Sequence, residues 1–234
     1  MKPEAVQQAL EHFWIKRDEQ RKKQKDGGEA GGEARGNGHL KAFEKIVADS
    51  FVDCGIGEGD IRMGKPYLPG YYRVRKQWDL VVLYKKVLVA AFEFKSQVGS
   101  VGKNFNNRFE EALGSATDLA AAQSENRPFG DVPPWLGYIF VLEETPDTEK
   151  LDRETRALFE TDPDFNGLSY NQRYQEMMRR FIGKNVYDIG WFLTTKRSED
   201  GTVTYKEPLH TATSRALQVA IEGRVKLVKA MLGE

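Results

Sequence analysis

The chain has 234 residues, which suits a single domain, residues 1–234, with a substantial core. Its 35 lysines and arginines balance 35 aspartates and glutamates, so a surface that binds nucleic acid has to be a local basic patch. One cysteine, Cys54, excludes an internal disulfide and a thiolate zinc cluster, and no segment has the apolar length of a membrane span or of a signal peptide, so we expect a soluble cytoplasmic protein without membrane contact.

Two helices are predicted before residue 60, separated by a glycine-rich segment. Apolar residues at helical spacing predict an amphipathic helix from residue 4 to about residue 20 that continues into the charged segment 16–25. Residues 26–38 have too little apolar area to offset their ordering entropy, so they form either a flexible loop or an arm that orders against DNA. Leu40, Phe43, Ile46 and Val47 mark a second helix that ends near Gly55.

Residues 60–76 combine turn-forming and basic residues with tyrosines. The basic residues are Arg62, Lys65, Arg73, Arg75 and Lys76, and the tyrosines are Tyr67, Tyr71 and Tyr72. Arginine donates paired hydrogen bonds to phosphate and tyrosine offers a stacking face, so the segment suits a nucleic-acid backbone, with Arg73 and Arg75 as the phosphate contacts. A solvated loop explains the same composition equally well.

Two apolar runs, residues 78–84 and 87–95, predict a pair of strands that carry Asp79, Glu93 and Lys95. Charged groups are rare in a sheet core unless they are paired or bind a metal. Two carboxylates beside a lysine are the groups that a magnesium-dependent phosphodiesterase needs, because carboxylates hold the hard cation and the lysine orients or deprotonates the attacking water.

The register of this strand pair tests the hypothesis. Glu93 and Lys95 are two residues apart and therefore share a face. A regular two-residue turn at Lys85 and Lys86 would pair Asp79 with Phe92 and place Asp79 on the opposite face. We therefore predict a loop with an odd number of residues or a β-bulge, which brings Asp79 opposite Glu93.

The rest of the chain alternates between helices and strands. We predict helices at 104–123, 170–182 and 213–232, strands at 135–142, 186–195 and 201–206, and irregular structure with short helical pieces at 144–168. This order indicates an α/β fold in which a central mixed sheet is flanked by helices.

Structural explanations compete with the metal site. Asp79 can cap a strand while Glu93 forms an ion pair with Lys95 at a sheet edge. Glu44, on the helix ahead of the strands, either leans over the sheet end and holds a second ion through water or is simply exposed. The three histidines lack ligand spacing, which argues against zinc chemistry.

The order Asp79, then Glu93-Phe94-Lys95, resembles the signature of the PD-(D/E)xK nucleases, with Trp78 in place of the family's proline. A closer similarity is to the XhoI type II restriction endonucleases. It runs from about residue 39 to about residue 200 and is carried by residues 68–73, 78–79, 89–96, 104–108, 169–170 and 173–175. The resemblance implies a restriction-endonuclease-like core and magnesium-dependent cleavage of both DNA strands at a short palindrome, CTCGAG or a close relative, leaving 5′-phosphates.

The resemblance also implies roles for single residues. Asp79 and Glu93 would bind Mg²⁺ with the Phe94 carbonyl, and Lys95 would act on the water; Glu44 matches only by its place on the helix before the strands. Base contacts are expected from Asn104, Asn106, Asn107 and Arg108, because amide and guanidinium groups can bond two base-edge atoms at once. Asparagines before a helix are also frequent caps. Arg173 would contact DNA or brace the fold.

A palindromic site implies a homodimer, in which each subunit cuts one strand of double-stranded DNA. A restriction enzyme also implies a companion DNA methyltransferase that protects the host genome. Two other functions remain open. One is a repair nuclease that recognises DNA shape, and the other is a catalytically silent DNA-binding module with the same fold.

Overall fold

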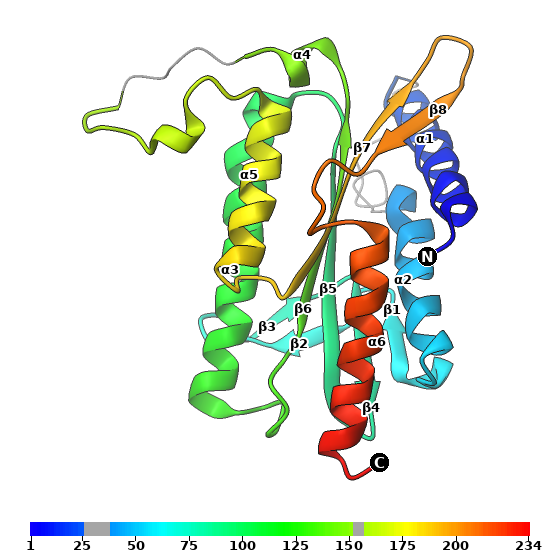
Figure 1. Cartoon of the computed structure of the whole chain (residues 1–234), viewed down its shortest axis with the longest axis vertical. Helices are drawn as coiled ribbons and strands as arrows, with labels where there is room; N and C mark the ends of the chain where they lie inside the picture. The colour runs from blue at the N-terminus through cyan, green and yellow to red at the C-terminus, as the bar shows by residue number, and fades with distance from the viewer. Residues whose placement is uncertain (26–37, 152–156) are drawn as a thin grey trace.

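The computed structural model of the chain describes residues 1–25, 38–151 and 157–234 and is built around a six-stranded sheet with the order β1-β4-β5-β6-β7-β8 (Figure 1). Its strands are β1 (Ile61–Met63), β4 (Leu80–Tyr84), β5 (Val87–Gln97), β6 (Leu136–Glu143), β7 (Ile189–Arg197) and β8 (Val203–Lys206). The three central strands β5, β6 and β7 are parallel, and the remaining neighbours are antiparallel. The predicted mixed sheet is confirmed.

Helices cover both faces of this sheet (Figure 1). One face carries α3 (Val101–Asn126) and α5 (Tyr170–Gly183), and the other carries α1 (Pro3–Lys25), α2 (Lys41–Asp53) and α6 (Ser214–Met231). Each face has its own apolar core, which explains why the central strands are nearly continuous apolar runs. None of the described helices has the length and apolarity needed to cross a membrane.

Short elements join these layers and correct part of the sequence interpretation. The segment 60–76 is more ordered than a loop, because it contains β1 and most of a separate antiparallel pair formed by β2 (Tyr67–Pro69) and β3 (Arg75–Gln77). The remaining short pieces are η2 (Gly38–Leu40), η3 (Glu58–Asp60), α4 (Pro146–Glu149) and η4 (Pro163–Phe165). The glycine-rich segment predicted at 26–38 lies outside the described residues except for Gly38.

The turn between β4 and β5 contains two residues, Lys85 and Lys86, which adopt φ angles of 47° and 67°. Such a left-handed pair matches the twist of a hairpin, although lysine is an unusual choice for it. Tyr84 pairs with Val87 as in a regular hairpin, but the register then shifts, so that Leu80 pairs with Phe92. The extra residue in β5 is Val89, and the predicted β-bulge is confirmed.

We expect Gly137→Ala to destabilise the sheet, because a Cβ atom at Gly137 would overlap the ring of Phe92 on the adjacent strand. Overpacking of this kind costs about 1–3 kcal/mol of unfolding free energy, measurable by urea denaturation. Gly114→Ala is the matched control, since a Cβ there meets nothing within 4 Å and alanine favours the interior of helix α3 by about 0.5–1 kcal/mol. Equal effects of the two substitutions would contradict this packing.

Candidate active site

Asp79 and Glu93 meet where β4 begins beside the middle of β5. The backbone N–H of Asp79 donates to the Phe92 carbonyl at 3.2 Å, and the Phe94 N–H donates to Asp79 Oδ2 at 2.8 Å. Val81 pairs with Ala91 and both pack in the same apolar core, and Asp79 and Glu93 each lie two residues from one member of that pair. The two carboxylates therefore lie on the same face of the sheet, as the register prediction required, and both residues are buried.

Lys95 extends this face along β5. Its Nζ contacts Glu93 Oε1 at 2.6 Å and lies 3.8 Å from Glu111 Oε2 on α3. Glu111 in turn accepts a hydrogen bond from Arg108 Nη1 at 2.9 Å. The structure thus brings Asp79, Glu93 and Lys95 together and connects Lys95 through Glu111 to the N-terminal half of α3.

The two carboxylates have opposite electrostatic environments. Burial and the nearby Glu93 carboxylate raise the pKa of Asp79. Burial acts in the same direction on Glu93, but the ammonium groups of Lys95 and Lys76 outweigh it and hold the pKa of Glu93 below its usual value. Burial lowers the pKa of Lys95, but the attraction to Glu93 outweighs it and the net pKa is raised. Lys95 is therefore an ammonium donor at neutral pH.

Glu44 lies in the helical layer on the other face of the sheet and interacts electrostatically with Asp79. It lies on α2 and is buried, with 8% of its surface exposed, so the simple exposed alternative is wrong. Burial and the Asp79 carboxylate raise the pKa of Glu44 to about 7. Glu44 is thus close enough to Asp79 to interact with it electrostatically.

The donor set fits a hard divalent cation. In an antiparallel pair a residue directs its N–H and C=O to the same side, so the Phe94 carbonyl faces the side on which its N–H meets Asp79. Two carboxylates and one carbonyl are oxygen donors of the type that Mg²⁺ binds. Among residues 1–25, 38–151 and 157–234, no three histidine, cysteine or acidic side chains converge on one point, so Glu44 does not join Asp79 and Glu93 in a three-carboxylate cluster.

The predicted phosphate contacts lie on and beside the β2–β3 hairpin. Arg73 is exposed, but its Nε donates to Asp118 Oδ2 of α3 at 2.8 Å. The other carboxylate oxygen of Asp118 accepts the backbone N–H groups of Tyr71 and Tyr72 at 3.0 and 2.8 Å. The guanidinium of Arg75, which is also exposed, lies 4.2 Å from the centre of the Tyr67 ring. The hairpin tip is therefore held against α3 and has an accessible cationic and aromatic surface.

The predicted base contacts lie in the first turns of α3 rather than before it. Asn104 donates to the Ser100 carbonyl at 3.0 Å, whereas Asn106 and Asn107 are exposed. None of the three asparagines caps the helix, since the residue that precedes it is Ser100. Arg108 is bound to Glu111, and on the neighbouring helix α5 the guanidinium of Arg173 lies 5.4 Å from the centre of the Tyr170 ring.

Sequence reasoning did not assign Lys76, Glu111 or Asp118 to the site. The Nζ of Lys76 contacts Glu93 Oε2, and the side chain is 11% exposed. The sequence places Lys76 among basic residues of a turn-rich segment, and no spacing rule connects it to Glu93. Glu111 and Asp118 lie seven residues apart on α3, so they share a helix face that a search for acidic i, i+7 pairs would have found.

The chain is similar to known restriction enzymes over most of its length. The family model for restriction endonuclease XhoI matches residues 18–207. Type II restriction enzyme BstVI of Geobacillus stearothermophilus is 35% identical over 195 residues, covering 80% of this chain and 87% of the relative. Type II restriction enzyme XhoI of Xanthomonas vasicola is 39% identical over 185 residues, 74% of this chain and 72% of the relative.

A third relative, type II restriction enzyme AbrI of Azospirillum brasilense, is 40% identical over 154 residues. That match covers 63% of this chain and 69% of the relative. No solved structure matches the chain.

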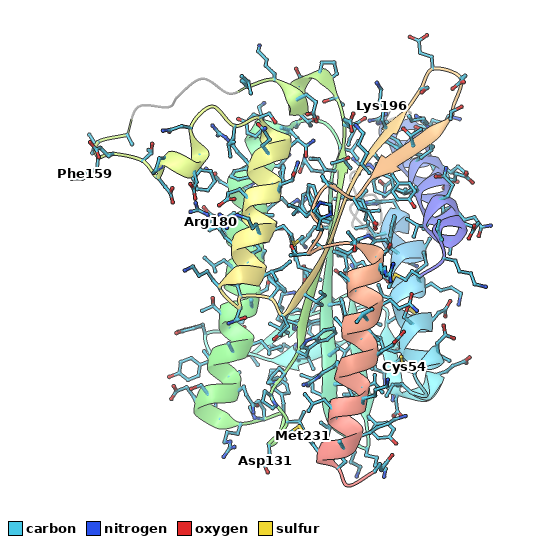
Figure 2. All side chains as sticks on the ribbon, viewed as in Figure 1. Cys54, Asp131, Phe159, Arg180, Lys196 and Met231 are labelled. Atoms are coloured by element: carbon cyan, nitrogen blue, oxygen red, sulfur yellow. The ribbon has the colours of Figure 1, made fainter. Side chains whose placement is uncertain are left out.

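We expect Asp118→Ala to release the hairpin tip, because it removes the acceptor of two backbone N–H groups and of the Arg73 guanidinium. The loss should be about 1–3 kcal/mol of unfolding free energy, accompanied by faster tryptic cleavage after Arg73. Asp131→Ala is the control, because Asp131 pairs with Arg127 while its side chain is 92% exposed (Figure 2). Unchanged proteolysis at Arg73 in the Asp118 variant would show that the anchor does not hold the tip.

Proposed function

The chain belongs to the restriction endonuclease XhoI family, and from this membership we propose that it cleaves both strands of DNA at a short palindrome, CTCGAG or a close relative, and leaves 5′-phosphate ends. The observation that carries the proposal is the convergence of Asp79, Glu93 and Lys95 on one face of the sheet, beside an exposed cationic hairpin. A nuclease needs both features, because the scissile phosphate must be held as well as attacked.

We propose Mg²⁺ as the cofactor, held by Asp79, Glu93 and the Phe94 carbonyl. When bound, it would polarise the phosphate and lower the pKa of the attacking water. Glu44 is buried and interacts electrostatically with Asp79, and we propose that it holds a second ion through water.

Lys95 is proposed to orient the attacking water and to stabilise negative charge on the phosphate. The raised pKa of Lys95 favours the ammonium form, which donates hydrogen bonds and does not accept a proton. Of the two roles considered for it, orientation is therefore better supported than deprotonation.

We assign the backbone contacts to the β2–β3 hairpin, with Arg73 and Arg75 as phosphate ligands. Base reading is assigned to the first turns of α3. Asn106 and Asn107 are exposed there, whereas Asn104 and Arg108 would have to exchange their present partners for base edges. Arg173, on the adjacent helix α5, is proposed as a further contact.

A palindrome is read most simply by two subunits related by a two-fold axis, so we propose a homodimer that cuts one strand with each site. Because a restriction enzyme would also cut the DNA of its own host, we propose a companion DNA methyltransferase that recognises the same palindrome. The charge balance of the whole chain agrees with local rather than global attraction to DNA.

We expect the purified chain with Mg²⁺ to cut a sequenced plasmid into discrete fragments whose ends map to CTCGAG or a close relative. Ca²⁺ should support DNA binding with little turnover, because it coordinates loosely and activates water poorly. Nicking that follows DNA shape would favour a repair nuclease instead. DNA retardation without cleavage at any ionic strength would identify a silent binding module.

Removing either carboxylate should abolish cleavage while affecting stability differently. Asp79→Asn keeps an acceptor for the Phe94 N–H and removes a carboxylate whose pKa is raised, so its unfolding free energy at about pH 8 should equal or exceed that of the wild type. Glu93→Gln removes the anion that two lysines contact and should lose about 1–3 kcal/mol. Urea denaturation and single-turnover cleavage measure both effects.

Lys196→Gln, on the exposed end of β7, serves as a surface control and should cleave normally (Figure 2). If Asp79→Asn cleaves DNA at a rate close to that of the wild type, Asp79 is a structural cap and the proposed metal site is wrong.

A further inference from the structure

A second lysine is bound to the proposed metal ligand Glu93, and the Asp, Glu-x-Lys pattern does not include it. Lys76 lies on β3, contacts Glu93 Oε2, and donates to the Gln77 carbonyl at 2.9 Å. Its Nζ also lies 4.3 Å from the centre of the Trp78 ring. Only 11% of its side chain is exposed, so the ion pair between Lys76 and Glu93 is largely shielded from solvent.

Both oxygens of Glu93 are therefore engaged by cations. Lys95 contacts Oε1 at 2.6 Å and Lys76 contacts Oε2. Together with Asp79, these side chains form a set of two negative and two positive charges when all four are ionised. A divalent ion that binds Glu93 competes with these two ammonium groups for the carboxylate oxygens, and repulsion between the cations favours the departure of one ammonium.

The two lysines differ in how they can leave. Lys95 is on β5, the same strand as Glu93 and part of the central sheet. Lys76 belongs to the separate β2–β3 pair, whose other residues are mostly exposed. Displacing Lys76 needs a movement of that small hairpin or of a long side chain, without any change in the central sheet.

We propose that Lys76, bound to Oε2 of Glu93 in the DNA-free protein, acts as an internal competitor of the divalent ion for that carboxylate. The inference rests on the proposed function, because it concerns the same metal site. Lys76 is a positioning residue in this scheme, and it keeps the DNA-free protein weak in divalent-ion binding.

The test is Mn²⁺ binding to the full chain without DNA, measured by isothermal titration calorimetry and by the electron paramagnetic resonance signal of free Mn²⁺. Lys76→Met should bind Mn²⁺ about tenfold more tightly than the wild type, because one opposing charge at contact distance is removed. Lys76→Arg retains the cation and should remain within about twofold of the wild type. Lys196→Met removes an equal charge from an exposed site and is the matched control (Figure 2).

Equal affinities of Lys76→Met and Lys196→Met would overturn the inference, and so would equally tight binding by the methionine and arginine variants at position 76. Lys76→Gln, checked by urea denaturation, repeats the test if the methionine variant folds poorly. Adding Asp79→Asn to Lys76→Met should abolish the tight binding; if it persists, the ion lies elsewhere and the inference fails.

The measurements distinguish an error in the competitor role of Lys76 from an error in the proposed metal site. A wild-type protein that cleaves DNA with Mg²⁺, together with no gain in Mn²⁺ affinity on losing Lys76, refutes the competitor alone. Absence of both cleavage and Asp79-dependent Mn²⁺ binding, in the wild type and in every Lys76 variant, refutes the metal site and the competitor together.

Discussion

The β-bulge in β5 is the constraint on which the site depends. Strand side chains alternate between faces, so the regular hairpin that begins at Tyr84 and Val87 would direct Asp79 and Glu93 to opposite faces. One extra residue, Val89, restores the pairing that brings the two carboxylates together. Val89 and the residue after it both pack into the same apolar core, as expected where two consecutive residues oppose one partner residue. Backbone pairing inside the central sheet, and not the surrounding loops, sets the geometry of the carboxylate pair.

The two carboxylates differ in how far neighbouring charges compensate for their burial. Glu93 is compensated by two ammonium groups, and its pKa is lowered in spite of its burial. Asp79 accepts the Phe94 backbone N–H, but burial together with Glu93 raises its pKa, so its negative charge opposes folding at neutral pH. Perturbed pKa values of this kind cluster at functional sites.

The sequence was sufficient for the elements that carry strong periodicity and insufficient for contacts between distant segments. The strand pair around Asp79 and Glu93 was predictable because its apolar runs are long. A count of residues from a two-residue turn gives the wrong face for Asp79, and the bulge was predicted from the requirement that the two carboxylates meet. Strands β1, β2 and β3 were missed, because each has three residues and none of these is buried. Arg224 on α6 is buried and donates to the carbonyls of Val89 and Pro133, and no local spacing indicates these contacts because only the tertiary packing brings the three residues within reach.

Helix α3 connects the proposed chemistry to the proposed DNA contacts. Glu111 and Asp118 are separated by two helical turns and project from the same face. Glu111 lies near Lys95. Two turns further along α3, Asp118 accepts hydrogen bonds from the Arg73 guanidinium and from two backbone N–H groups at the tip of the β2–β3 hairpin. That hairpin also carries Lys76, which contacts Glu93. A displacement of the hairpin relative to α3 would therefore change the cations around Glu93 while β5 stays in place, so contacts made at the exposed tip have a direct physical route to the carboxylates.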